Sequence, residues 1–196
     1  MTVLVLNEEK EQQLREKKAV KSLLWVSLVS IFMLFAGLTS AYIVRQAEGN
    51  WLAFELPQMF YYSTAVILMS SITMNWAMSS AKKDNAGNLK LALLLTLILG
   101  LAFVCLQISG WKDLVAQGIF FGGEGSTASG SYLYVLSGVH LAHMIGGIIS
   151  LIVVLYKALK EKYNSQNIFG LQLCSIFWHF LDILWIYLFL FLLFIR

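Results

Sequence analysis

The chain has 196 residues, enough for one domain of ordinary size, of which 59% are hydrophobic and 13% charged, with a mean hydropathy of +0.73. Because a soluble chain carries about 25% charged residues, this composition excludes a water-soluble globule and predicts a protein whose apolar side chains face lipid. A net charge of only +3, with no aromatic-studded basic patch, argues against nucleic acid as a partner. The two cysteines lie in apolar runs and lack the spacing of a zinc site or a disulfide framework.

The first twenty-one residues form a charged segment with four glutamates and five lysines or arginines. They lack the short basic start and cleavable apolar core of a signal peptide, so we expect no cleavage and a cytoplasmic N-terminal segment at 1–21. The polarity of this segment favours a solvated, flexible tail over a short charged helix on the membrane surface.

Five apolar stretches follow, each long enough to cross roughly 30 Å of hydrocarbon. In lipid each must be a helix, because an open strand would leave backbone polar groups unsatisfied. The sequence therefore predicts an all-α, polytopic membrane protein, a bundle of five transmembrane helices in a domain at 22–196. The expected spans are about 22–44, 58–81, 89–111, 131–156 and 170–195.

Lysines and arginines are distributed unequally between the two ends of these spans. Eleven fall on the side of the N-terminus, and only Arg45, Lys112 and Arg196 fall on the other side. Cytoplasmic loops carry the excess of basic residues in membrane proteins. The count therefore predicts an N-terminus inside and a C-terminus outside.

Hydroxyl and amide side chains within the spans are few, and we expect them to form hydrogen bonds between helices. They are Ser27, Ser30, Thr39 and Ser40 in the first span, Ser70, Ser71, Thr73 and Asn75 in the second, and Thr96 and Gln107 in the third.

Asp182 is the one acidic residue of eleven that lies deep in a span. A carboxylate near the bilayer centre costs about 2.5–3.5 kcal/mol, so it needs a partner or a function. His179 stands three residues earlier on the same helix face and could donate to the carboxylate, while the indoles of Trp178 and Trp185 offer further donors. A buried pair that fixes this helix is favoured over a proton relay, because a relay needs several ionisable groups in sequence.

The other histidines, His140 and His143, share one face of the fourth span. With His179 they could be imagined as haem or copper ligands, because imidazole is a common ligand of both metals. Two haems would need four axial ligands, and no HxxxH or Cys/His/Met cluster is present. Polar core histidines are therefore favoured, and we expect no metal, cofactor or catalytic site in this chain.

The fourth span also carries small residues at four-residue intervals: Gly138, Ala142, Gly146 and Ser150. Such a stripe lets another helix backbone approach closely, so we expect this span to belong to a tightly packed interior. The sequence contains no P-loop, GxGxxG, GxSxG or HExxH motif. The most economical interpretation is a subunit packed against a larger membrane complex.

The last span, with WHFLDILWIYLF at residues 178–189, closely resembles the signature of subunit III of the haem-copper respiratory oxidases. The residues that match this signature one by one are His179, Phe180, Asp182 and Trp185.

Two further spans resemble the same family. The fourth span agrees with its Gly-x-His-x-x-His pattern through Gly138, His140 and His143, and residues 32–45, FMLFAGLTSAYIVR, are similar to an aromatic-rich segment that ends in Ala-Tyr. A count of five spans is similar to the shorter bacterial form of the family, which lacks the first two helices of the mitochondrial members.

This sequence departs from the family pattern at two acidic positions. The family usually has a membrane glutamate directly after a serine in the first matching span, where this chain has Ile31 after Ser30. The acid that follows the glutamine near the end of the third span is also missing, because Gln107 leads into Ile-Ser-Gly-Trp. The function attributed to the family glutamate is therefore not carried over to this chain.

The resemblance implies a non-catalytic accessory subunit of a respiratory terminal oxidase, most simply a cytochrome c oxidase that reduces oxygen to water and pumps protons. Haem and copper would lie in partner subunit I, which this chain would bind directly, with subunit II and a respiratory supercomplex as further partners. The chain would support the stability and proton uptake of subunit I and would hold bound phospholipid. Its expected location is the bacterial cytoplasmic (inner) membrane, as a multi-pass protein.

Three alternatives stay open at this point. The chain could be an accessory subunit of a quinol oxidase or of a nitric oxide reductase. It could also be an independent haem-binding or transport protein that uses His140, His143 and His179. Because the electron donor of an oxidase is bound by other subunits, this sequence does not distinguish cytochrome c from quinol.

Overall fold

The computed structural model describes residues 2–49, 51–52, 54–123, 125–165 and 167–195, with side chains described from residue 11 onward. Over these residues the chain forms five α-helices joined by loops. The helices are α1 (Thr2–Ala47), α2 (Gln58–Lys82), α3 (Ala86–Ala116), α4 (Ala128–Leu159) and α5 (Phe169–Phe194). Each predicted span coincides with one of these helices, although most of the helices extend several residues further.

Four helices, α1, α3, α4 and α5, are long and apolar enough to cross a membrane. The remaining helix, α2, has 25 residues, but it mixes serine, threonine and asparagine with its apolar residues. The structure is thus an all-helical protein with four candidate membrane spans in its described part.

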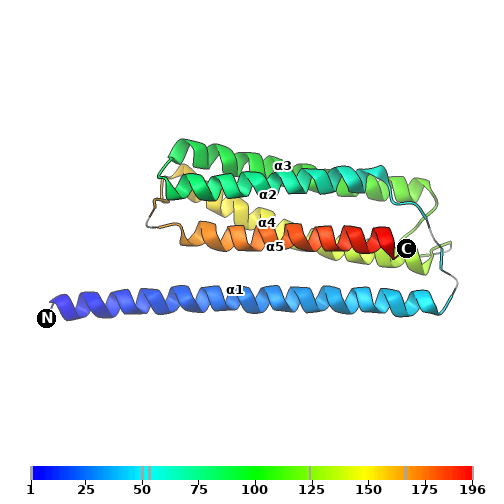
Figure 1. Ribbon diagram of the computed structural model, residues 1–196, viewed down its shortest axis with the longest axis horizontal. Coiled ribbons are helices and arrows are strands. Elements are labelled where there is room, and N and C mark those ends of the chain that lie inside the picture. The colour runs from blue at the N-terminus through cyan, green and yellow to red at the C-terminus, as the bar shows by residue number, and fades with distance from the viewer. Residues whose placement is uncertain (1, 50, 53, 124, 166, 196) are drawn as a thin grey trace.

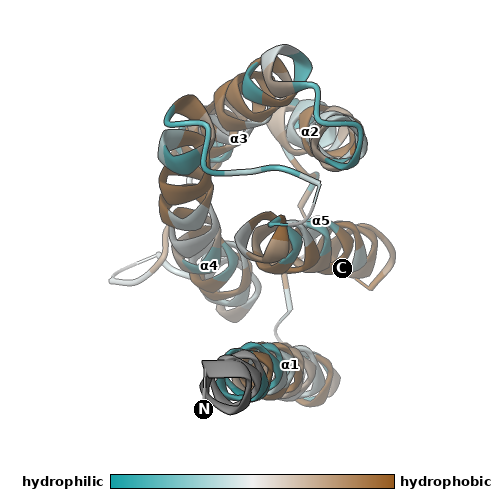
Figure 2. Ribbon diagram, turned by 90° about the vertical axis from the view of Figure 1, so that its left-hand side faces the viewer, coloured by the Kyte–Doolittle hydropathy of each residue, from teal (hydrophilic) through white to brown (hydrophobic). Residues whose placement is uncertain are grey.

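Helices α2 to α5 form a closed ring, in which α2 packs on α3, α3 on α4, α4 on α5, and α5 on α2. Figure 2 looks along the helices and shows this ring with α1 standing to one side. Among the other helices, α1 contacts only α4 and α5. The core of the molecule therefore lies inside the four-helix ring, and α1 is a peripheral element.

Helix α1 continues without interruption through the charged N-terminal segment and projects past the end of the ring at which α5 begins (Figure 1). Its 46 residues correspond to roughly 69 Å. The expectation of a flexible tail is therefore wrong. The segment consists mostly of strong helix formers, no glycine or proline precedes Gly37, and Arg15 pairs with Glu11 one turn away at 3.3 Å.

Short connections and local caps define the helix ends. The side chain of Asn85 accepts a hydrogen bond from the backbone N–H of Asn88 at the start of α3, and Thr127 accepts one from Gly130 at the start of α4. Pro57 precedes α2, where its missing N–H and fixed φ suit the first turn of a helix. Neighbouring helices of the ring run antiparallel (Figure 1).

The predicted small-residue stripe of α4 does not mediate packing inside this chain. A Cβ atom at Gly146 would meet nothing within 4 Å, and one at Gly138 would make only ordinary contact with Trp111 at 3.9 Å. The close approach occurs at the next residue, Gly147, where a Cβ atom would lie 3.0 Å from Leu181 Cδ1 of α5. The other stripe residues, Ala142 and Ser150, are exposed and half-buried. At Gly138 and Gly146 the stripe therefore makes no close helix contact within this chain, and Ser150 lines a groove between α1, α4 and α5.

Candidate functional site

Trp178 lies at the centre of the ring, fully buried, and contacts each of the other three ring helices. Its indole Nε1 donates to Ser70 Oγ of α2 at 2.9 Å. A Cβ atom at Gly100 of α3 would lie 2.7 Å from Trp178 Cη2, and one at Gly147 of α4 would lie 3.5 Å from Cε3. Two glycines thus create the space for this indole, and one hydroxyl fixes its orientation.

The sequence alone does not identify these two glycines as packing residues. The available signal was an isolated glycine inside an apolar helix, which costs about 1 kcal/mol relative to alanine and therefore usually has a packing reason. Gly100 has this property, but nothing in one sequence connects it with Trp178.

His179 and Asp182 share one face of α5, as predicted, but the expected direct hydrogen bond is not formed. His179 Nδ1 lies 2.8 Å from Ser71 Oγ of α2 and 3.7 Å from Asp182 Oδ2. The longer distance exceeds that of a hydrogen bond, so Ser71 is the partner of the imidazole. The Asp182 side chain is only 3% exposed, and neither of its oxygens has a hydrogen-bond partner in the described part of the chain.

Trp185 repeats the arrangement of Trp178 two turns further along α5. Its Nε1 donates to Thr64 Oγ1 of α2 at 3.0 Å, and its ring stacks on Phe60 at a centroid distance of 5.9 Å. Both indoles therefore donate to hydroxyls of α2 and not to Asp182, contrary to the sequence-based expectation. We call Ser70, Ser71, Trp178, His179 and Asp182 the α2–α5 polar cluster.

His140 is fully buried among aromatic rings. Its imidazole lies 6.4 Å from Phe35, 5.9 Å from Phe103 and 5.2 Å from Trp185, measured between centroids. Neither of its nitrogens has a hydrogen-bond partner among the described residues. His143 is partly exposed, and its Nδ1 lies 2.7 Å from the backbone oxygen four residues earlier.

The three histidines are not gathered at one place. His140 and His143 both lie beside Phe35 of α1, whereas His179 faces Ser71 of α2. Within the residues that the structure describes, no three His, Cys, Asp or Glu side chains could together hold a metal ion.

Other hydroxyl and amide groups join helices, as the sequence predicts for this class of residue. The bonds between helices are Thr73 to Thr96 at 2.8 Å, Gln107 to Ser63 at 2.9 Å, and Thr39 to Tyr187 at 3.0 Å. In contrast, Ser27 and Ser30 donate to the backbone of their own helix and are exposed.

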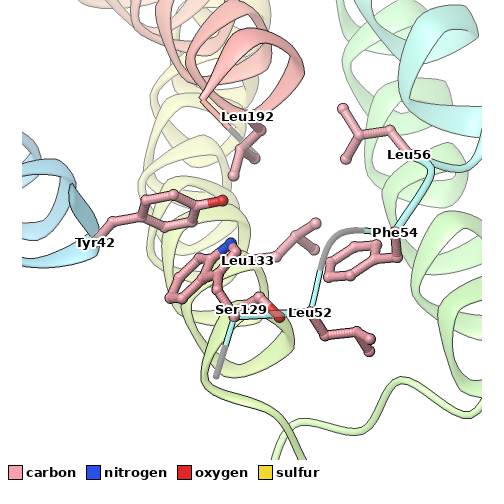
Figure 3. A pocket seen from close by; sticks show the side chains of 8 residues that line it. Tyr42, Leu52, Phe54, Leu56, Ser129, Leu133 and Leu192 are labelled. Atoms are coloured by element: carbon pink, nitrogen blue, oxygen red, sulfur yellow. The ribbon is translucent and has the colours of Figure 1, made fainter. Parts of the chain in front are cut away.

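The C-terminal end of α1 is attached to the ring by an aromatic cluster. Figure 3 shows Tyr42 of α1 facing Leu133 of α4 and Leu192 of α5 across a small space. The Tyr42 ring lies 4.6 Å from Trp51 and 5.1 Å from Phe191, both edge-on. The space is about 10 Å³, which limits it to roughly one water molecule, so this is a packing contact and not a ligand pocket.

At the opposite end of the ring, the connection between α2 and α3 forms polar contacts with the connection between α4 and α5. Asp84 Oδ1 accepts from the backbone N–H of Ser165 at 2.6 Å, and Lys90 Nζ donates to Glu161 Oε1 at 2.9 Å. Hydrogen bonds from the Ser165 side chain and backbone lower the pKa of Asp84, and the hydrogen bond and charge of Lys90 lower the pKa of Glu161. Both carboxyl groups are exposed, so each contact contributes little to stability.

The four long apolar helices indicate a membrane protein. Within its ring, two indoles and one imidazole of α5 form hydrogen bonds with hydroxyl groups of α2. A sequence profile of cytochrome c oxidase subunit III matches residues 50–195 of this chain. The chain belongs to the cytochrome c oxidase subunit III family.

Curated relatives agree with this assignment. A probable cytochrome c oxidase subunit 3 of Nocardia farcinica is 33% identical over 188 residues, which cover 91% of this chain and 88% of the relative. Cytochrome bo(3) ubiquinol oxidase subunit 3 of Pseudomonas aeruginosa is 33% identical over 170 residues, covering 84% and 79%. Cytochrome c oxidase subunit 3 of Rattus norvegicus is 33% identical over 130 residues, covering 65% and 46%.

The predicted resemblance to subunit III is thereby confirmed, and the family implies membership in a multi-subunit respiratory oxidase, an oxidoreductase complex. Because similar relatives are named as subunits of a cytochrome c oxidase and of a ubiquinol oxidase, the family alone does not define the type of oxidase.

Proposed function

We propose that this chain is the non-catalytic accessory subunit III of a cytochrome c oxidase in the bacterial cytoplasmic membrane, bound directly to subunit I. The observation that carries the proposal is the similarity to the Nocardia relative, which extends over 91% of this chain and 88% of that protein. In this proposal haem and copper lie in subunit I, and subunit II and a respiratory supercomplex are further partners. The chain contributes stability to subunit I and supports its proton uptake.

The proposal includes five membrane spans, with α2 as the fifth. Polar residues lower the hydropathy of α2, but Ser70, Ser71 and Thr64 bond to side chains of α5, and Thr73 bonds to α3. Hydroxyls satisfied by neighbouring helices do not have to face lipid, which supports α2 as a span between α3 and α5. The excess of basic residues at the N-terminal side supports a cytoplasmic N-terminus.

The proposal also includes a bound phospholipid. A groove of about 480 Å³ runs between α1, α4 and α5, with apolar walls that include Leu24, Val153 and Phe177. Lys157 and Tyr163 line the same groove, and the buried Tyr163 hydroxyl has no hydrogen-bond partner in the described chain. An apolar groove with a cation and a hydroxyl donor has the chemistry of a phospholipid site.

A second candidate function is subunit III of a ubiquinol oxidase. The observation in its favour is the 33% identity to the Pseudomonas aeruginosa bo(3) ubiquinol oxidase subunit over 84% of this chain. The two candidates differ in the electron donor of the complex and not in the chemistry of this chain.

Purification of the tagged chain in mild detergent tests the proposal. We expect a haem-containing subunit I to co-purify and the complex to consume oxygen with reduced cytochrome c. Oxygen consumption with ubiquinol alone would favour the second candidate. A chain that purifies alone and retains a Soret band would contradict both candidates and would favour an independent haem-binding protein.

A further inference from the structure

The small space beside the Tyr42 ring lies between α1, α4, α5 and the connection from α1 to α2. Its volume is about 10 Å³, which is too small for an organic ligand. A buried site needs about 10–15 Å³ to hold one water molecule, so the space has the size of a single water. Figure 3 shows the hydroxyl of Tyr42 directed from α1 toward Leu133 and Leu192 across this space.

The indole of Trp51 brings an unused hydrogen-bond donor to this space. Trp51 belongs to the connection after α1 and lines the space. Its Nε1 atom is shielded from solvent and has no hydrogen-bond partner among the described residues. A buried donor without a partner is destabilising, and nearly all such groups in native structures bond to protein or to an ordered water.

Two buried hydroxyl groups, those of Tyr42 in α1 and Ser129 in α4, line the same space. The Ser129 hydroxyl lies 3.2 Å from the Thr127 hydroxyl, and either oxygen can donate in this contact. Because a hydroxyl offers one donor and two acceptor sites, Ser129 can still accept a hydrogen bond from a further group. An indole donor and two hydroxyls give three polar partners, the usual number for a buried water.

The other side chains around this space are apolar, and no charged residue is among the described residues that line it. They are Leu52, Phe54, Leu56, Leu133 and Leu192. An ion would find no opposite charge here, and a buried ion without one is strongly unfavourable. The size and the polar groups therefore fit a small neutral molecule that both accepts and donates hydrogen bonds.

We propose that one ordered water molecule occupies this space, where it accepts a hydrogen bond from Trp51 Nε1 and donates to the hydroxyl oxygens of Ser129 and Tyr42. Helix α1 contacts only α4 and α5 of the ring. The water joins α1 and the connection that follows it to α4, so it is part of the attachment of α1 to the ring. This site does not depend on the type of oxidase.

A high-resolution cryo-EM map of the complete purified complex tests the site directly. We expect one rounded density at about 2.7–3.2 Å from Trp51 Nε1. Trp51→Phe keeps an aromatic ring but lacks the donor, so its map should lose this density. Absence of the density in a map that shows ordered water at other buried polar groups would overturn the proposal, and so would an elongated density from a larger molecule.

Hydrogen exchange at the last two turns of α1, measured in the same complex, tests whether Trp51 and Ser129 share one water. Trp51→Phe and Ser129→Ala should each speed exchange about fivefold, the factor that corresponds to one net hydrogen bond. The double variant should also be about fivefold faster, because either change already releases the water. Trp25→Phe is the matched control, since this indole of α1 is exposed, and it should change exchange less than about twofold.

Independent effects of the two substitutions would multiply to about 25-fold in the double variant. That result, or an equal effect of Trp25→Phe, would contradict a shared water. If the variants do not assemble into the complex, the map of the unmodified complex decides the question.

Discussion

Asp182 joins two properties that rarely occur together in a membrane helix. Its side chain is almost completely buried, and both carboxyl oxygens lack a hydrogen-bond partner in the described chain. Its near neighbour, the His179 imidazole, bonds to Ser71. Asp182 Oδ2 lies 3.7 Å from His179 Nδ1, beyond hydrogen-bond distance, so we expect the shape of the carboxyl beside the imidazole to matter more than its charge.

Asp182→Asn preserves this shape without the charge, so we expect full occupancy of the subunit in the complex and normal oxygen consumption. Asp182→Ala removes the side chain next to His179 and leaves a small cavity. It should lower attachment of the subunit by about 1–3 kcal/mol. Subunit stoichiometry and oxygen consumption are measured on the same preparation of each variant. Full occupancy of Asp182→Asn with strongly slowed turnover would instead identify a proton relay.

The tight space around Trp178 predicts that a substitution at Gly100 is destabilising. Gly100→Ala places a methyl group 2.7 Å from Trp178 Cη2, and this ring is held by its bond to Ser70. Because a buried, bonded indole cannot move aside freely, the variant should lose about 1–3 kcal/mol of stability. Gly37→Ala is the matched control, since a Cβ atom there meets nothing within 4 Å and alanine raises helix propensity by about 1 kcal/mol.

Thermal unfolding of the two purified variants in the same detergent checks this prediction. Gly100→Ala should unfold at a lower temperature than the unmodified chain, and Gly37→Ala at an equal or higher temperature. Equal midpoints for the two variants would contradict a packed indole at this position.

The helices themselves were predictable because runs of apolar residues of this length have few other structures in lipid. The pairing between helices was not predictable. That Trp178 donates to Ser70, and that Gly147 and not Gly146 faces α5, depends on helix rotation and register. One sequence without internal symmetry contains no information on which faces meet. The helical N-terminal segment was missed for another reason, since its charge favours solvation but does not prevent a helix.

Substitutions at two adjacent glycines of α4 distinguish packing inside the chain from packing against other molecules. Gly147→Leu would drive a side chain into Leu181 and should destabilise the ring in the isolated chain. At Gly146 a Cβ atom meets nothing within 4 Å, so Gly146→Leu starts into open space. If the exposed stripe of α4 meets a helix of a partner subunit, Gly146→Leu should leave the unfolding midpoint unchanged but reduce co-purification of the complex. Leu151→Ala, at a residue buried inside the ring, serves as the comparison and should act mainly on the midpoint. Unchanged assembly of Gly146→Leu would show that the stripe faces lipid.

The contacts between the α2–α3 connection and the α4–α5 connection should depend on pH. Contacts with Ser165 and Lys90 lower the pKa values of Asp84 and Glu161 in the folded chain, so their contribution is complete above the unfolded values of 3.8 and 4.5. This contribution to stability is lost as the pH falls below the unfolded values and passes through the lower pKa values of the folded chain. Hydrogen exchange at the Ser165 amide should therefore show protection that is constant from neutral pH to about pH 5 and that falls on further acidification. Asp84→Asn should remove most of this pH dependence, and an unchanged profile would contradict the contact.

At the scale of the whole molecule, the ring of α2 to α5 and the peripheral α1 are held together in different ways. The ring is closed by buried hydrogen bonds and aromatic contacts, whereas α1 touches only α4 and α5 and exposes most of its apolar side chains. In a multi-subunit oxidase, this exposed surface of α1 is available to lipid or to partner subunits. The family profile covers residues 50–195, which contain the ring, while the similarity to the Nocardia relative extends over 91% of the chain and so into α1.

The proposed orientation of the molecule is supported by the chemical difference between its two ends. At one end, Lys21, Lys82 and Lys157 line grooves, and the free start of α1 projects beyond the ring. At the other end, an aromatic cluster around Tyr42 anchors α1. Because basic residues favour the cytoplasmic side, the proposed five spans would put the C-terminus outside.

A cysteine added at the C-terminus should accordingly react with a membrane-impermeant maleimide in intact cells in which Cys105 and Cys174 have been replaced by alanine. A cysteine in place of Lys83, in the loop after α2, should react only after the cells are permeabilised, because that loop is predicted to be cytoplasmic. If α2 did not cross the membrane, the chain would have four spans and its two ends would lie on the same side, and the C-terminal cysteine would then be protected in intact cells. Protection of the C-terminal cysteine together with labelling of the Lys83 position would contradict the proposed topology. A cysteine near the N-terminus would then be labelled in intact cells if the orientation is reversed, and protected if α2 is not a span.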